Sequence, residues 1–193
     1  LVEGELDVIP SVQAGVKSVV AIKGSAFTEE QAQLISRYTR NVYMSLDSDL
    51  AGQEAIKRAV LIADKLDLSI RVVQIKGGKD PGEVAIENPR SWREMVKGAV
   101  LYWDFLLDSV GSRFDPKSGA GAEEISREIV PALSQISNAV VKSHYATKLA
   151  KILAIPEESI YAEISRYSRK KELTFLKETV SKIETGAHKR SDE

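Results

Sequence analysis

The stretch Tyr43-Met44-Ser45-Leu46-Asp47-Ser48-Asp49-Leu50-Ala51-Gly52-Gln53-Glu54-Ala55 joins an apolar run to a pair of aspartates and then to a helix-forming segment. Residues two apart in an extended chain point to the same side, so Asp47 and Asp49 can converge if the strand continues past Leu46. Converging carboxylates repel each other unless a proton or a cation such as Mg²⁺, which prefers oxygen ligands, lies between them. The same Asp-Ser-Asp sequence is also typical of a turn that caps the next helix, and spacing alone favours that second interpretation.

Short apolar runs and helical patterns alternate on both sides of this stretch. Strands are predicted over residues 1–4, 18–22, 41–46 and 69–75, and helices over residues 7–15, 28–38 and 51–66. Pro10 is tolerated only in the first turn of a helix, which places the start of the first helix near residues 7–9. The alternation predicts an α/β fold with a mostly parallel sheet flanked by helices.

The pattern changes near residue 89, after which the sequence predicts helices only. These helices are expected over residues 92–110, 123–141, 143–153 and 157–183, with a long loop over residues 111–121. We therefore predict an α/β domain over residues 1–90 and an all-α helical subdomain over residues 91–193. The subdomain is expected to end in a polar connector helix and a disordered tail over residues 188–193.

The composition narrows the chemistry that the chain can perform. Lysine and arginine number 27 against 28 acidic residues, a net charge of −1, which argues against a strongly basic nucleic-acid-binding surface. The chain has no cysteine and only two histidines, so it offers no disulfide, no thiolate nucleophile and no zinc site of the usual kind.

No apolar run approaches the ~20 residues that a membrane span needs, and no signal peptide is visible. We therefore expect a cytoplasmic protein without a membrane partner. The chain starts at Leu1 within a strand-like run, and we expect it to be an N-terminally truncated fragment of a longer protein.

Acidic residues follow three of the four predicted strands. Glu3 ends the first strand, Asp47 and Asp49 end the third, and Asp80 lies in the loop after the fourth. Ligands of open parallel sheets bind outside the carboxyl ends of the strands, so these acids are expected on one edge. The sequence therefore predicts a divalent-metal site on that edge.

The pattern of motifs resembles the Toprim fold of bacterial primases, topoisomerases and some nucleases, and more closely the back half of the RNA polymerase core of bacterial DNA primase. The resemblance rests on Val2-Glu3-Gly4, Leu6-Asp7-Val8, Ala14-Gly15-Val16, the segment 24–31, Asp47-Ser48-Asp49, Lys79-Asp80-Pro81, Phe105-Leu106-Leu107 and the segment 155–159. The Lys-Asp-Pro loop distinguishes primases from the other Toprim families.

The resemblance implies roles for particular residues. Glu3 would be catalytic, as a metal ligand or general acid/base, and Mg²⁺ or Mn²⁺ would be bound by Glu3, Asp47, Asp49 and Asp80. Secondary roles would fall to Asp7, Lys79 and Glu83, and contacts with substrate to Gly4, Gly24 and Ser25.

The resemblance also implies an activity and partners. A nucleotidyltransferase of this family joins nucleoside triphosphates into short RNA primers on a single-stranded DNA template during replication. The replicative helicase would be a partner, bound through a domain absent from this chain. Zinc is expected only in another domain absent from this chain, and we expect this fragment alone to be inactive.

Several positions depart from the family pattern. Leu50 replaces an arginine, Gly82 replaces a second aspartate after Asp-Pro, and Glu5 replaces a common aromatic residue. Lys23, beside Gly24, could meet a phosphate, although a solvated lysine is the simpler interpretation. The alternatives are therefore a Toprim-type nuclease or topoisomerase piece, or a degenerate, non-catalytic interaction module.

Overall fold

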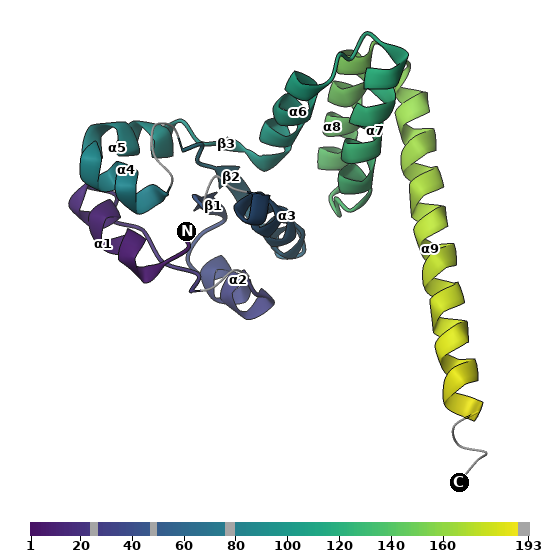
Figure 1. Ribbon diagram of the computed structural model, residues 1–193, viewed down its shortest axis with the longest axis horizontal. Coiled ribbons are helices and arrows are strands. Elements are labelled where there is room, and N and C mark those ends of the chain that lie inside the picture. Colours follow the sequence, from purple (N-terminus) through teal and green to yellow (C-terminus); the bar gives the residue numbers. More distant parts are fainter. Residues whose placement is uncertain (24–26, 47–49, 76–79, 189–193) are drawn as a thin grey trace. The chain divides into compact units, whose positions relative to one another are not determined.

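Helices and short strands alternate in the first part of the chain, and helices follow, in the computed structural model (Figure 1). The structure describes residues 1–23, 27–46, 50–75 and 80–188. The helices are α1 (Glu5–Gln13), α2 (Glu29–Ser36), α3 (Leu50–Asp64), α4 (Pro81–Glu87), α5 (Pro89–Lys97), α6 (Tyr102–Arg113), α7 (Gly119–Ser134), α8 (Ala139–Leu153) and α9 (Glu157–His188). The strands are β1 (Asn41–Met44), β2 (Ser69–Val72) and β3 (Val100–Leu101). The predicted α/β fold followed by a helical region is confirmed.

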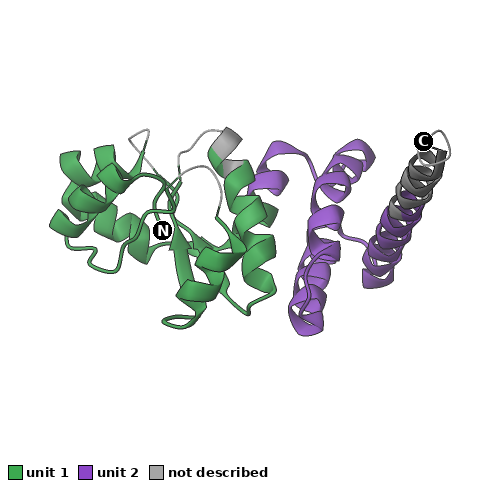
Figure 2. Cartoon of the chain, turned by 90° about the horizontal axis from the view of Figure 1, so that it is seen from below, with its two compact units in different colours: residues 1–108 green, residues 109–193 purple. Residues whose placement is uncertain are grey.

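The chain divides into two units, Leu1–Asp108 (unit 1) and Ser109–Glu193 (unit 2), shown in separate colours in Figure 2. The division falls after α5, β3 and part of α6, later than the boundary that the sequence suggested near residue 90. Unit 1 therefore includes residues 91–108, which the sequence had assigned to the helical subdomain.

The sheet of unit 1 has the strand order β1-β2-β3, and Val2 lies beside β1. Val2 forms single parallel bridges with Ala21 on one side and with Ser45, next to β1, on the other. β1 pairs with β2 in parallel, and β2 pairs with β3 in antiparallel fashion. The predicted strands over 1–4 and 18–22 are reduced to single bridges, because Gly4 already caps α1 and Lys23, at φ 50°, turns the chain.

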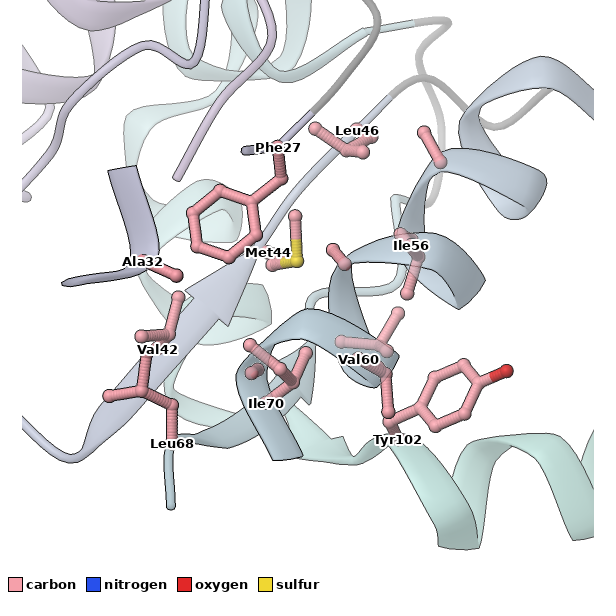
Figure 3. Packing of buried hydrophobic residues seen from close by; sticks show 14 of the residues in the cluster. Phe27, Ala32, Val42, Met44, Leu46, Ile56, Val60, Leu68, Ile70 and Tyr102 are labelled. Atoms are coloured by element: carbon pink, nitrogen blue, oxygen red, sulfur yellow. The ribbon is translucent and has the colours of Figure 1, made fainter. Parts of the chain in front are cut away.

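Two apolar clusters cover the two faces of this sheet. Val42 and Met44 of β1 alternate with exposed residues, and they pack against α2 and one face of α3 (Figure 3). Val73, just after β2, packs on the other face with Ala14 and with Trp92 of α5. Burial within the first cluster raises the pKa of the Tyr102 hydroxyl to about 12, and the negative charge of Glu54 adds to the shift.

Three predictions in unit 1 are wrong in detail. α1 begins at Glu5, so Pro10 lies inside the helix rather than in its first turn. Residues 81–87 form α4 instead of continuing the predicted loop, because Asp80 caps the helix and Pro81 is compatible with its first position. β3 interrupts the predicted helix over 92–110, and two residues are too few to show a strand pattern in sequence.

The helices of unit 2 also differ from the prediction at their ends. The predicted helix over 123–141 is two helices, because Asn138 caps α8 by accepting hydrogen bonds from the N–H groups of Val140 and Val141 at 2.9 and 3.1 Å. The predicted loop over 111–121 is shorter, since α6 continues to Arg113 and α7 starts at Gly119. α9 buries Ile160 near its start and contacts α7 and α8.

Within the described part of the chain, no helix has both the length and the apolar character needed to cross a bilayer.

The start of α7 has a glycine that cannot gain a side chain. Ser118 caps the helix by accepting the N–H of Gly121 at 3.0 Å, and a Cβ on Gly121 would lie 2.0 Å from the backbone oxygen of Asp115. We expect Gly121→Ala to lower the free energy of unfolding by roughly 1–3 kcal/mol, the usual cost of forced overpacking. Gly119→Ala is the matched control, because nothing lies within 4 Å of its Cβ position. Urea denaturation followed by circular dichroism checks this, and equal stabilities of the two variants would contradict it.

Candidate functional site

The carboxyl ends of the segments bridged to Val2 lie side by side at one edge of the sheet. Val2 is bridged to Ala21 and to Ser45, so the residues that follow each of these positions leave the sheet at the same edge. The N–H of Val73 donates to the carbonyl of Met44 at 2.9 Å, which brings the end of β2 to this edge as well. The predicted convergence of strand ends is therefore present in the backbone.

Glu3 occupies the turn between Val2 and α1. It is half-buried and follows Val2 directly, and Gly4 after it is the N-cap of α1 with extended φ and ψ of −103° and 155°. The Asp7 carboxylate, in the first turn of α1, accepts the N–H of Gly4 through Oδ2 at 3.0 Å. Because this N–H belongs to the peptide that joins Glu3 to Gly4, Asp7 orients the backbone that carries Glu3.

Asp80 occupies a comparable place at the start of α4. Its Oδ1 accepts the N–H of Glu83 at 2.7 Å, so Asp80 is the N-cap of α4. A Cβ added to Gly82 would lie 2.6 Å from Oδ1 of Asp7 and 3.3 Å from Oδ1 of Asp80. The two carboxylates therefore face one small space beside Gly82.

Lys23 lies close to this edge, just after the Ala21 bridge. Its ammonium forms an ion pair with Glu5 at 3.2 Å, and both side chains are largely exposed. An exposed pair of this kind contributes little to stability. Glu5, which replaces the common aromatic residue, thus has a partner in Lys23.

Five of the predicted site residues lie outside the described residues, namely Gly24, Ser25, Asp47, Asp49 and Lys79. Glu3, Gly4, Asp7, Asp80 and Glu83 are described, and of these the structure brings Gly4, Asp7, Asp80 and Glu83 into the contacts given above. Among the residues that the structure places, no group of three acidic, histidine or cysteine side chains could hold a metal ion. The predicted four-acid metal site therefore stays a prediction.

Sequence reasoning missed the contacts that organise the described acids. The spacing Gly4-x-x-Asp7 is that of an N-cap and the third helical residue, and Asp80-Pro81 is a typical helix start, so both signals were present. The proximity of Asp7 to Asp80 had no signal in the sequence, because it depends on how α1 packs against α4.

Unit 2 holds a groove of about 700 Å³ between α7 and α9. Val130, Pro131 and Tyr167 supply its apolar surface, and charges of both signs line it. Arg127 is held by Glu123 and Glu124 at 2.8 and 2.6 Å, so the charges in the groove largely compensate each other.

Comparison with known proteins connects both regions to one kind of enzyme. A family model described as Toprim-like matches residues 1–85, and one described as the DnaB-helicase binding domain of primase matches residues 104–158. A DNA primase of Clostridium acetobutylicum is 31% identical over 166 residues, and one of Listeria monocytogenes is 37% identical over 173 residues. The aligned regions cover 86% of this chain in both cases, but only 28% and 27% of the two relatives.

Solved structures agree with these sequence matches. The Aquifex aeolicus primase structure, described as its zinc-binding and RNA polymerase domains, matches 82% of this chain and 38% of its own, with a TM-score of 0.68 and 28% identity. A structure described as the DnaG catalytic core matches 82% of this chain and 53% of its own, with a TM-score of 0.66 and 26% identity.

Proposed function

Because the chain belongs to the bacterial DNA primase family, whose Toprim and helical regions it carries, we propose that it works as part of a catalytic core for metal-dependent synthesis of short RNA primers on single-stranded DNA. The observation that carries the proposal is the meeting of the Glu3 turn, Asp7 and Asp80 at the edge where the strands end. The chain spans less than a third of the length of the curated relatives, so the whole activity is proposed for the complete protein.

The donor set of this edge suits a hard divalent cation. The space beside Gly82, which a Cβ would fill, is faced by carboxylate oxygens of Asp7 and Asp80, and Mg²⁺ and Mn²⁺ prefer such oxygens. Glu3, Asp47, Asp49 and Asp80 would hold the ion, with Glu83 next to them. When bound, it would neutralise triphosphate charge and activate a 3′-hydroxyl.

The chain's own residues would bind and orient the nucleotide. Glu3 would accept a proton or bind the ion, and the departure of its turn from the sheet at this edge supports that role. Backbone N–H groups of Gly24 and Ser25, and the ammonium of Lys79, would contact the triphosphate, and the peptide at Gly4 would lie against the substrate. The ion pair with Glu5 engages Lys23, so we assign Lys23 no phosphate contact.

The alternative functions are not favoured. The relatives described above are primases, and both the Toprim-like match and the primase helical match lie in one chain. A nuclease, a topoisomerase or a non-catalytic module would leave the helical match without an explanation.

We propose that this chain alone makes no primers, although its family consists of nucleotidyltransferases. It has no cysteine and a net charge of −1, so it offers neither a zinc-thiolate site nor a strongly basic surface for a template strand. A cytoplasmic location, where nucleoside triphosphates and single-stranded DNA meet, follows from the same proposal.

A replicative helicase is the proposed protein partner. The match of residues 104–158 to a helicase-binding domain of primase supports a contact within α6–α8. The sequence alone placed this contact in a domain outside the chain, and that placement stays a prediction.

Metal binding tests the proposed centre directly. We expect the chain to bind Mn²⁺, and Asp47→Asn and Asp49→Asn each to weaken binding at least about tenfold, because each removes an anionic oxygen ligand. Free Mn²⁺ measured by electron paramagnetic resonance gives the affinity. Asp108→Asn is the control, since Asp108 is exposed on α6 in a position remote in sequence from the Toprim motifs. Equal affinities for all of these proteins, or no binding by the unmodified chain, would contradict the proposed centre.

A binding measurement distinguishes the two proposed locations of the helicase contact, α6–α8 or a domain outside this chain. If α6–α8 contact the helicase, this chain binds the purified replicative helicase on its own, with a dissociation constant in roughly the micromolar range expected for a small interface. Val140 on α8 and Leu6 on α1 are both exposed apolar side chains. Val140→Asp should weaken the complex, whereas Leu6→Asp, outside α6–α8, should not. Fluorescence anisotropy measures this. Absence of binding at high concentration would place the helicase contact in a domain outside this chain.

A further inference from the structure

The C-terminal half of α9 carries two leucines that the rest of unit 2 leaves exposed. α9 runs from Glu157 to His188 and extends beyond the ends of α7 and α8 (Figure 1). Leu173 and Leu176 are 59% and 57% exposed. We propose that these leucines begin a dimerisation seam, which pairs in parallel with the same segment of a second copy of this chain. This pairing depends neither on the proposed metal centre nor on the proposed helicase contact.

The exposed leucines lie on the opposite side of α9 from the residues that anchor the helix in its unit. Ile160 and Ile164 are 1% and 7% exposed, and α9 contacts α7 and α8. Because an α-helix turns by about 100° per residue, Leu173 and Leu176 lie roughly half a turn away from these two isoleucines. α9 therefore has two separate apolar faces, one for its own unit and one that points away from it.

The apolar residues in this half of α9 have the spacing of a coiled-coil seam. They follow one another at intervals of three, four and three positions, at Leu173, Leu176, Val180 and Ile183. Such intervals keep apolar residues on one stripe when two helices coil around each other. A mostly polar helix gains most of its stability from packing this kind of stripe. The pattern therefore favours a second helix as the occupant of the exposed face.

Charges beside the seam favour a second copy of α9 and a parallel orientation. Glu172 directly precedes Leu173, and Lys177 directly follows Leu176. In two parallel helices in register, the position before the seam residue of one helix meets the position five residues later on the other. Glu172 of each copy would therefore meet Lys177 of the other, which gives every dimer two pairs of opposite charge.

The seam begins at Leu173, because the two preceding positions of the repeat are basic. Arg166 and Arg169 stand seven residues before Leu173 and Leu176, and both arginines are exposed. Arg166 pairs with Glu163 of the same helix at 2.6 Å. Charged residues at seam positions reduce the stability of a coiled coil, so pairing is confined to the last part of α9. A seam this short predicts a dimer with a dissociation constant in roughly the micromolar range or weaker.

Cross-linking tests the parallel arrangement, because the chain has no cysteine of its own. Leu176→Cys places one thiol on the seam, where a parallel pair brings the two Cα atoms within the roughly 4.4–6.8 Å that a disulfide needs. Thr174→Cys is the matched control, since Thr174 is also exposed but lies off the seam. Under mild oxidation we expect at least about ten times more covalent dimer from Leu176→Cys, measured by non-reducing gel electrophoresis.

Analytical ultracentrifugation of the whole chain measures the dimer without a cross-link. Leu173→Asp should weaken dimerisation at least about tenfold, because it places like charges opposite each other in the seam, whereas Thr174→Asp should leave it unchanged. Glu172→Lys should weaken it severalfold. Adding Lys177→Glu to that variant should restore the affinity, because the exchanged charges again meet their opposites.

Four results would overturn the proposal. The first is a chain that stays monomeric up to roughly 1 mM, far above a micromolar dissociation constant. The second is a dimer that Leu173→Asp leaves intact, which would place the contact elsewhere. The third is equal cross-linking of Leu176→Cys and Thr174→Cys, which would exclude the parallel seam. The fourth is a charge exchange between positions 172 and 177 that fails to restore the affinity.

Discussion

Backbone hydrogen bonds around Val2 determine where Glu3, the proposed catalytic acid, leaves the sheet. The N–H of Val2 donates to Val20 at 3.1 Å, its carbonyl accepts from Ile22 at 3.0 Å, and the carbonyl of Leu1 accepts from Ser45 at 2.9 Å. Val2 is 1% exposed, so an unpaired backbone group there would be costly. This pairing brings together segments that are far apart in sequence. It is also why Glu3 leaves the sheet beside the segment that precedes Asp47.

Two helices of unit 1 begin next to this hydrogen-bonded region. α1 and α4 both start at the edge where the strands end, and each start has a carboxylate that accepts a backbone N–H. At Gly82 the two helix starts lie close together, with carboxylate oxygens of Asp7 and Asp80 on either side.

Much of this arrangement could be predicted from the sequence, and the failures have physical causes. The buried face of α3 follows from its pattern of period 3.6, and the parallel pairing of β1 with β2 from the alternation of strands and helices. β3 was missed because its two residues owe their conformation to β2. Pro10 misled the placement of α1, since a helix that gains packing elsewhere tolerates an interior proline. The acids at the edge were identified by motif, but the contact between Asp7 and Asp80 depends on tertiary packing.

The central claim, a divalent-metal centre at the edge that Val2 organises, is tested most directly by anomalous scattering from crystals of this chain soaked in Mn²⁺. The account predicts a peak within about 2.0–2.5 Å of carboxylate oxygens of Glu3, Asp47 and Asp49, the range for hard oxygen ligands. Such a map would also show whether Asp80 or Glu83 completes the site. A map without a peak at high Mn²⁺, with these carboxylates bound to lysines or backbone N–H groups instead, would contradict the account.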